Sequence, residues 1–352
     1  MNILLHIASR LYGVVVALRN WLYDKEILHS YPPTLPTICV GNLAVGGTGK
    51  TPHVEYLVHL LQEHGYRVAV LSRGYKRSTT GFVEADESST TATIGDEAMQ
   101  LKQAFPELIV AVCEDRVAGI RHLQALHPDL QCIVLDDAFQ HRRLHAGYNI
   151  VLTQADRLYT DDYLLPLGRL REQAKGIHRT NCVVVTKCAD TIQPIDMRIT
   201  ANKLNLPPYQ PLLFTRMEYE PLRPLWGEGP APCIEALRQQ KVLLLTGIAQ
   251  PHYLQEHVSK SGCEVYPLTF ADHHAFKEAD VQRIVNAYEH HHCSVIITTE
   301  KDAVRLKECS SFPNTLKSTV FVQPIHVVFL GEDQQTFNTN ILDYVRKSTS
   351  DR

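Results

Sequence analysis

The chain lacks several features that would assign it to a specialised class of protein. Its nine cysteines are odd in number and include no C-x-x-C pair, which argues against a disulfide framework and favours a reducing compartment. The formal net charge is only −3, so we expect no general attraction to nucleic acid. The apolar stretch between Arg10 and Arg19 is shorter than the roughly 20 residues of a membrane-spanning helix. No clear signal-peptide cleavage site follows it, so we expect no secretory signal.

A glycine-rich loop follows the first strand-like segment. The overall composition is otherwise that of an ordinary globular protein. Residues 37–42 form an apolar run, and apolar side chains recur with helical spacing after Pro52. The glycines let main-chain N–H groups approach phosphate oxygens, while Lys50 and Thr51 suit a triphosphate and its Mg²⁺. Ala44 stands where the pattern G-x-x-x-x-G-K-[ST] has glycine, and an ordinary glycine-rich turn is the alternative. The predicted ATP-binding residues are Ala44, Val45, Gly46, Gly47, Thr48, Gly49, Lys50 and Thr51.

Two pairs of adjacent acidic side chains lie later in the chain, one at the end of an apolar run and one at the start of a predicted helix. An apolar run ends in Asp136 and Asp137, as in the Walker B motif whose aspartate helps to hold Mg²⁺. Asp96 and Glu97 open a predicted helix, where carboxylates are usually caps but are also placed to act as a base or to bind metal. The candidate metal ligands are Thr51, Asp136, Asp137 and Glu97.

Cationic side chains lie in loops at the ends of predicted strands. Arg73 follows the strand of residues 67–72, and Arg169 and Arg171 lie in a loop between two further strands. Open α/β sheets bind ligands at the carboxyl ends of their strands, and the guanidinium group matches the geometry of phosphate. A solvated basic turn is the alternative for a loop of this kind. The candidate phosphate ligands are Arg73, Arg116, Arg169 and Arg171.

The rest of the chain predicts a second α/β unit. Proline and glycine are frequent in residues 207–232, which we interpret as a domain junction, and alternating strands and helices resume at residue 241. Residues 320–330 are extended, and their pairing with residues 211–218 would return the last helix to the first domain.

The N-terminal 23 residues mix apolar side chains with arginine, tryptophan and tyrosine. This composition suits a helix in a membrane interface, but its periodicity is equally consistent with a helix packed on the domain core.

Gathered in order, these motifs resemble those of the tetraacyldisaccharide 4′-kinase family over nearly the whole chain. The resemblance rests on Gly41-Asn42-Leu43, Gly49-Lys50-Thr51-Pro52, Ser72-Arg73-Gly74-Tyr75, Gly95-Asp96-Glu97, Asp115-Arg116, Leu135-Asp136-Asp137, Phe139-Gln140-His141, residues 166–172, Asp272-His273-His274 and Thr299-Glu300-Lys301-Asp302. Ala138 departs from the glycine expected in this family. Enzymes of the family phosphorylate a lipid A precursor at the cytoplasmic face of the bacterial inner membrane.

The resemblance implies two Rossmann-like, P-loop-type α/β lobes with mostly parallel sheets, joined by a two-stranded linker, and an N-terminal amphipathic helix. The corresponding division of the chain is 1–28 for a membrane-interface helix, 29–210 for the nucleotide-binding lobe, 211–232 for the linker, 233–317 for the second lobe, 318–333 for a returning linker strand and 334–352 for a C-terminal helix packed on the first lobe. The active site would lie in the cleft between the lobes.

The resemblance also implies transfer of the γ-phosphoryl group of ATP, with Mg²⁺, to the 4′-hydroxyl of a tetraacyldisaccharide 1-phosphate, giving lipid IVA. Asp96 would be the base, assisted by His273 from the second lobe, with Lys50 on the β- and γ-phosphates. Further contacts to the substrate or its phosphate would come from Tyr75, Gln140 and His141. The implied partners are the lipid A disaccharide precursor and the inner-membrane surface, with no nucleic acid.

Two rival functions remain open at this point. A soluble P-loop kinase of small molecules would have a dispensable N-terminal helix. A non-enzymatic nucleotide-dependent switch would carry a signature lysine at the position of Val45, which counts against it.

Overall fold

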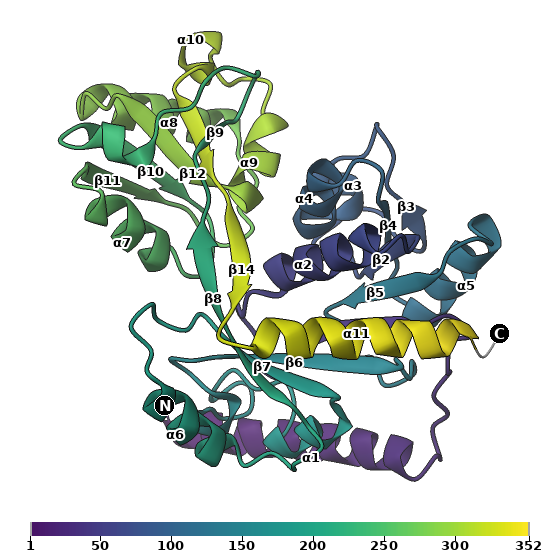
Figure 1. Cartoon of the computed structure of the whole chain (residues 1–352). Helices are drawn as coiled ribbons and strands as arrows, with labels where there is room; N and C mark the ends of the chain where they lie inside the picture. Colours follow the sequence, from purple (N-terminus) through teal and green to yellow (C-terminus); the bar gives the residue numbers. More distant parts are fainter. Residues whose placement is uncertain (1, 351–352) are drawn as a thin grey trace.

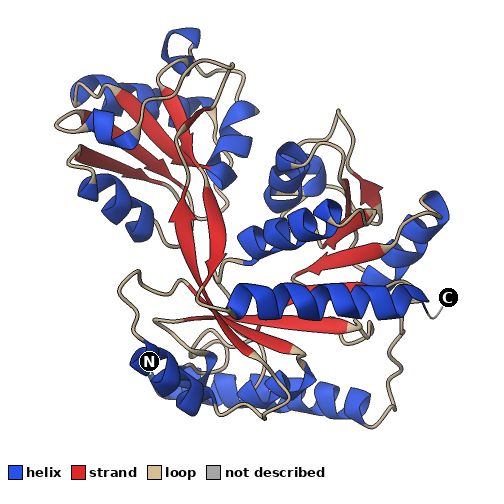
Figure 2. Ribbon diagram, viewed as in Figure 1, coloured by secondary structure: helices blue, strands red, loops and turns tan. Residues whose placement is uncertain are grey.

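The computed structural model describes residues 2–350, which form two α/β lobes joined by a pair of long strands (Figure 1). Within these residues, the first lobe contains a nine-stranded sheet and the second a five-stranded sheet. Figure 2 shows helices on both faces of the larger sheet, as expected when parallel strands are joined by crossover helices. The predicted α/β fold class is confirmed.

The larger sheet has the order β14-β8-β7-β6-β1-β5-β2-β4-β3. In that order its strands are Ile325–Phe329, Leu212–Tyr219, Cys182–Thr186, Tyr148–Gln154, Thr37–Asn42, Cys132–Asp136, Val68–Ser72, Ile109–Val112 and Val83–Glu84. Neighbours pair in parallel except at the two edges, where β14 and β3 run antiparallel to their neighbours. The helices of this part are α1 (Asn2–Asp24), α2 (Lys50–Glu63), α3 (Thr91–Ile94), α4 (Asp96–Ala104), α5 (Arg116–Leu126), α6 (Pro194–Leu204) and α11 (Asp333–Ser350), with 3₁₀ turns η1 (Tyr159–Asp161) and η2 (Ala174–Arg179).

The smaller sheet has the order β11-β10-β12-β13-β9. Its strands are Glu264–Thr269, Lys241–Thr246, Val295–Thr299, Val320–Gln323 and Arg223–Pro224. The helices of the second lobe are α7 (His252–Lys260), α8 (Glu278–His290), α9 (Glu300–Lys307) and α10 (Asn314–Lys317), with the 3₁₀ turn η3 (Ile234–Leu237).

The connection between the lobes is the antiparallel pair β8 and β14, in which Tyr219 lies opposite Ile325 and Thr215 opposite Phe329. The first half of β8 also pairs with β7, so the connection continues the larger sheet. Two short strands, β9 and β13, lie within the segments assigned to the linker but pair in the sheet of the second lobe. Pro324 separates β13 from β14 because proline cannot donate a ladder hydrogen bond. The division of the chain at the stated boundaries stays a prediction.

The apolar spacing of α2, α5 and α11 buries one face of each of these helices against the larger sheet. Val54, Leu57 and Leu61 of α2 are fully buried on one side of the sheet, together with Phe337 and Ile341 of α11. A second cluster on the opposite side includes apolar side chains of α5. The larger sheet is therefore a rigid platform, and the loops at its strand ends are held in fixed positions.

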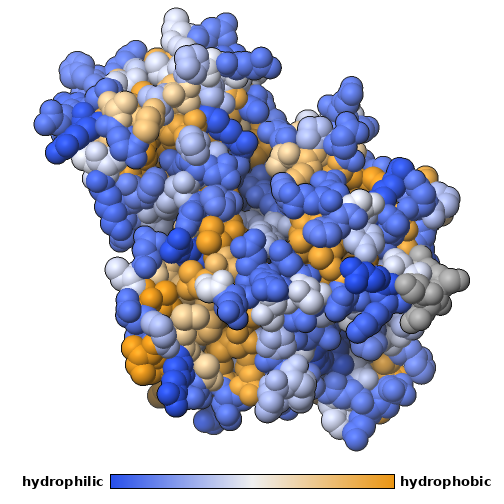
Figure 3. Space-filling model, viewed as in Figure 1, coloured by the Kyte–Doolittle hydropathy of each residue, from blue (hydrophilic) through white to orange (hydrophobic). Residues whose placement is uncertain are grey.

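Helix α1 turns its apolar side chains away from the protein. Its exposed residues recur every three or four positions: Ile3, Leu4, Ile7, Leu11, Val14, Val15, Leu18 and Trp21. The inward face carries Ser9 and Gly13, both buried. Figure 3 shows apolar surface at the lower left, where α1 begins. The apolar stretch between Arg10 and Arg19 is short, but α1 continues through both arginines. By length and composition alone, Ile3–Asp24 could cross a membrane.

Candidate active site

A cleft of about 880 Å³ opens between the lobes at the carboxyl ends of β1, β2 and β5. The first lobe contributes the glycine-rich loop, residues 72–75 and the start of α4. The second lobe contributes residues 248–250, His273 and Lys301, and α1 contributes Tyr12, Val16 and Arg19. The cleft lies where open α/β sheets bind ligands.

The glycine-rich loop joins β1 to α2, which begins at Lys50. Gly46 and Gly49 have φ angles of +112° and +85°, a region that favours glycine. Ala44 is bridged to Leu170 in an antiparallel pairing, and Val45 N–H donates to the Arg169 carbonyl at 2.8 Å. Because this pairing requires no left-handed backbone, a side chain is tolerated where the pattern has glycine.

Two aspartates stand at the carboxyl end of β5, Asp136 as its last residue and Asp137 just after it, and they differ in charge environment. Asp137 accepts from Arg171 Nη1 at 2.8 and 2.9 Å and lies 3.8 Å from Lys50 Nζ. Burial raises the pKa of Asp137, but Lys50 and Arg171 outweigh it and the pKa is lowered. For Asp136, burial and the nearby charge of Glu97 raise the pKa to about 7. Its Oδ1 is buried without a hydrogen-bond partner among the described residues.

Asp96 and His273 meet across the cleft. Asp96 is the first residue of α4, and its Oδ2 lies 2.8 Å from His273 Nδ1. On the other side of the imidazole, Lys301 Nζ lies 3.1 Å from Nε2. Because an ammonium group can only donate, Nε2 accepts and Nδ1 carries the proton that is donated to Asp96. Burial raises the pKa of Asp96, but the hydrogen bond from His273 and the charge of Lys301 lower it below its ordinary value.

The four predicted arginines occupy different environments. Arg73 is exposed and lines the cleft, and Arg171 reaches Asp137 there. Arg116 is buried, and its Nη1 donates to the Cys113 carbonyl at 2.8 Å. Arg169 is not among the residues that line the cleft, but its guanidinium lies beside Gly46 of the glycine-rich loop, and its Nε lies 3.5 Å from Asp162 Oδ2.

The remaining predicted contacts also line the cleft. Tyr75 is half-exposed, and its ring packs edge-on against His273 with centroids 5.0 Å apart. His141 is near Asp115, and burial together with the charge of Arg116 lowers its pKa. Gln140 Nε2 donates to the Asn42 carbonyl at 2.8 Å. These positions are compatible with the expected roles, which stay predictions.

The sequence reasoning missed Lys187 and Gln250 as lining residues. Lys187 follows β7 and hydrogen-bonds Gln250 of the second lobe, and burial lowers its pKa to about 8. Gln154 donates both to Gln250 at 2.8 Å and to the Gly47 carbonyl at 3.2 Å. A polar residue at the end of an apolar strand was the available signal for Lys187. The contact with Gln250 depends on how the lobes dock, which no local pattern encodes.

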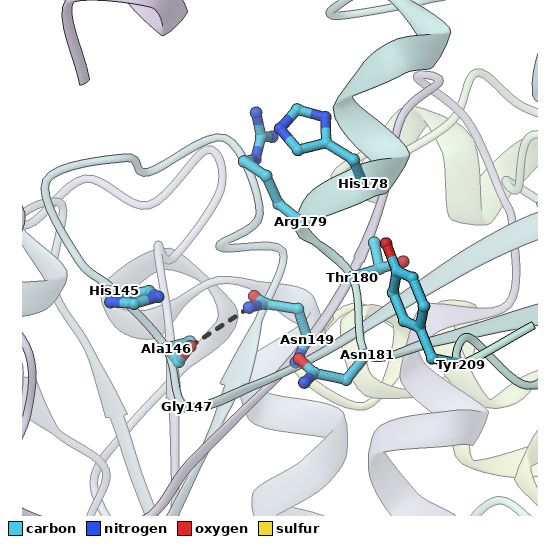
Figure 4. Close-up of a pocket in the computed structure, with 9 residues that line it drawn as sticks. All are labelled: His145, Ala146, Gly147, Asn149, His178, Arg179, Thr180, Asn181 and Tyr209. Carbon is cyan, nitrogen blue, oxygen red and sulfur yellow. Dashed lines mark hydrogen bonds between the residues drawn. The ribbon is translucent and has the colours of Figure 1, made fainter. Parts of the chain in front are cut away.

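A separate cavity of about 320 Å³ lies at the amino ends of β6 and β7 (Figure 4). Its lining includes His145, Asn149, His178 and Tyr209, and none of the predicted site residues. The predicted residues therefore gather at the opposite, carboxyl ends of the strands.

A glycine-rich loop at a strand–helix turn, a lysine beside paired aspartates and a carboxylate–histidine pair in the same cleft define a P-loop phosphotransferase. Residues 1–346 match the family described as Tetraacyldisaccharide-1-P 4'-kinase. The chain is 47% identical to the Tetraacyldisaccharide 4'-kinase of Parabacteroides distasonis, with 98% of this chain and 95% of that protein covered. It is 44% identical to that of Phocaeicola vulgatus, with 99% and 96% covered.

The fold is similar to that of the crystal structure of LpxK from Aquifex aeolicus in complex with ATP. The TM-score is 0.72 at 28% identity, with 96% of this chain and 97% of that chain covered. The chain belongs to the tetraacyldisaccharide 4′-kinase family, and it is a kinase, as the motifs predicted.

Proposed function

We propose that this chain transfers the γ-phosphoryl group of ATP to the 4′-hydroxyl of a tetraacyldisaccharide 1-phosphate, forming lipid IVA. The observation that carries the proposal is the hydrogen bond between Asp96 and His273. Asp96 is buried and does not itself line the cleft, but His273, Gly95 and Glu97 line it together with the glycine-rich loop. Family membership supports the chemistry, and the lining of one cleft by His273 and the glycine-rich loop supports the roles given to them.

The residues present fit ATP and Mg²⁺. Residues 45–51 surround the N-terminus of α2, where main-chain N–H groups and the helix dipole favour phosphate. The unpartnered Oδ1 of Asp136 is expected of a group whose partner is a bound cation. Among residues 2–350, no cluster of three or more His, Cys, Asp or Glu side chains is arranged to hold a metal. Mg²⁺ commonly binds through one or two carboxylates together with phosphate oxygens, so this does not conflict.

We assign Thr51 and Asp136 as the protein ligands of Mg²⁺, and Asp137 as the residue that orients Lys50 and Arg171. The metal would supply neutralisation of the charge that builds up on the transferred phosphate. Lys50 adds a second positive charge at the same place. Glu97 lines the cleft 3.8 Å from Lys301 Nζ, where it would support the metal or the loop.

Asp96 acts as the general base in this proposal. The pKa of Asp96 is lowered, so its carboxylate is ionised at neutral pH and able to accept the proton of the 4′-hydroxyl. His273 donates to Asp96 Oδ2, and the Glu97 main-chain N–H donates to Asp96 Oδ1 at 3.0 Å. A carboxylate oxygen has two lone pairs, so the proton of the hydroxyl would be accepted on the second lone pair of Oδ1. Since the two residues belong to different lobes, docking of the lobes completes the pair and excludes water from the phosphate.

The proposed acceptor is membrane-bound, and the exposed apolar face of α1 supports this. That face lies beside the cleft, because Tyr12, Val16 and Arg19 of the same helix line it. We place the protein peripherally on the cytoplasmic face of the bacterial inner membrane, where it would take the lipid A disaccharide precursor. A soluble small-molecule kinase would have no use for an apolar face at this position.

The test is incubation of the protein with γ-labelled ATP and a tetraacyldisaccharide 1-phosphate in mixed micelles. We expect label on the 4′ oxygen, and Asp96→Asn should lower kcat about 10²- to 10⁴-fold while ATP binding is retained. Asp343→Asn on α11, which does not line the cleft, is the matched control. Label only in inorganic phosphate, or an Asp96→Asn variant that loses ATP binding alone, would refute the assignment.

A further inference from the structure

The side chain of Glu172 is almost completely buried between α1 and the cleft, with 1% of its surface exposed. Three donors converge on its carboxylate: Asn20 Nδ2 at 3.0 Å, Arg179 Nη2 at 2.8 Å and Gln140 Nε2 at 3.0 Å. A buried carboxylate is costly unless it is paired and hydrogen-bonded, so the positions of all three donors are coupled through it.

On one side, this carboxylate is attached to the helix whose opposite face is apolar and exposed. Asn20 belongs to the C-terminal half of α1. Two turns earlier, the Tyr12 hydroxyl donates to the Arg171 carbonyl at 2.7 Å. The helix is therefore hydrogen-bonded to two consecutive residues, Arg171 and Glu172, through side chains eight positions apart.

On the other side, the same two residues reach the phosphate end of the cleft. Gln140, which donates to Glu172, accepts from Arg171 Nη1 at 3.2 Å. Arg171 Nη1 also donates to Asp137 at 2.8 Å, and Asp137 lies 3.8 Å from Lys50 Nζ. A continuous series of polar contacts thus runs from the membrane-facing helix to the lysine of the glycine-rich loop.

Neutralisation of Arg179 is the simplest structural role for Glu172, but it does not require Asn20 or Gln140. Arg179 already packs over the Phe139 ring, 4.5 Å from its centroid, and forms a 2.8 Å ion pair with the carboxylate. The two amide side chains bind the same carboxylate from opposite sides, one from α1 and one from the loop after β5. These contacts join α1 to Gln140 through Glu172, beside a direct hydrogen bond from Arg19 Nη2 of α1 to the Gln140 carbonyl at 3.3 Å.

We propose that Glu172 is a positioning residue that couples the seating of α1 to the placement of Arg171 and Asp137 at the phosphates. This inference rests on the proposed function, since the readout is phosphoryl transfer. Displacement of α1 moves residues 171–172, and the guanidinium then loses its alignment with Asp137. The membrane-facing helix therefore takes part in setting the turnover rate as well as in attachment.

The test compares Asn20→Ala, Glu172→Gln, their double variant and Ser9→Ala in the full chain with the labelled-ATP assay. Ser9 is the matched control because its hydroxyl also joins α1 to the first lobe, donating to the Leu164 carbonyl at 2.9 Å, but outside this series of contacts. Alanine at position 20 preserves the helix, since alanine has the highest helix propensity. Thermal unfolding and vesicle sedimentation are measured for every variant.

We expect Asn20→Ala to lower kcat about fivefold to tenfold and to leave sedimentation with vesicles unchanged. This decrease in rate is smaller than the full loss of a hydrogen bond to a charged group would give, because Asn20 acts on the phosphates only through other residues. Glu172→Gln should lower it about 30-fold or more, and the double variant should match Glu172→Gln within about twofold because both changes break one series of contacts. Ser9→Ala should stay within about twofold of wild type.

Two outcomes would overturn the inference: equal kcat in Asn20→Ala and Ser9→Ala, or multiplicative effects in the double variant. If Glu172→Gln fails to fold, the comparison of kcat between Asn20→Ala and Ser9→Ala still tests the inference. Absence of labelled lipid with the wild-type chain would instead refute the proposed function, so the two failures are distinguishable.

Discussion

Replacement of Lys301 by alanine should lower kcat about 10- to 100-fold and shift the acid limb of the kcat/KM profile to higher pH. Lys301 Nζ lies 3.1 Å from His273 Nε2 and within 4.0 Å of carboxylate oxygens of Asp96, Glu97 and Asp272. Its ammonium group therefore holds the imidazole in one tautomer and helps to keep the base ionised.

The magnitude follows from the geometry. Two unit charges 4 Å apart attract by about 4 kcal/mol at an effective dielectric constant of about 20. Lys301 is 21% exposed, and Arg305 Nε remains 3.9 Å from Asp96, so only part of that attraction is lost. A net loss of about 1.4–2.7 kcal/mol corresponds to about 10- to 100-fold in rate. Because the charge of Lys301 lowers the pKa of Asp96, its removal raises that pKa and protonates the base at higher pH.

The assay measures kcat and KM for ATP and for the lipid acceptor between pH 5 and pH 9. Lys301→Arg should recover part of the rate, since the charge is retained. Lys307→Ala removes a lysine from the exposed end of the same helix and is the control. The reasoning would be wrong if Lys301→Ala raised KM for ATP with kcat unchanged, or if its acid limb coincided with that of wild type.

Three further predictions concern other parts of the chain. Lys50→Ala should lower turnover by at least about 10²-fold with little change in melting temperature; near-normal turnover would contradict the phosphate assignment. Deletion of residues 2–23 should reduce sedimentation with vesicles, and unchanged sedimentation would favour a helix that serves packing alone. Burial lowers the pKa of His53 from 6.5 to about 4, so the unfolded state binds the proton more readily and stability falls by about 3 kcal/mol as the pH drops from 6.5 to 4. In His53→Gln that part of the pH dependence should disappear from denaturant unfolding curves.

Much of the fold and part of the site were predictable because their determinants are local. An apolar run, a glycine-rich loop and helical spacing identify β1, the loop and α2, since each depends on the residues in that segment. The aspartates after β5 and the carboxylates opening α4 were found for the same reason. The family resemblance added the link between Asp96 and His273, which are 177 positions apart.

The sequence by itself determined the elements, their alternation and the chemical groups at the strand ends, because neighbouring residues specify these features through backbone geometry and amphipathic periodicity. Only the tertiary structure decided which of those groups meet. The outward direction of the apolar face of α1 and the convergence of Asn20, Gln140 and Arg179 on Glu172 depend on how distant segments pack. Contacts of this kind are made in three dimensions between residues that share no local pattern.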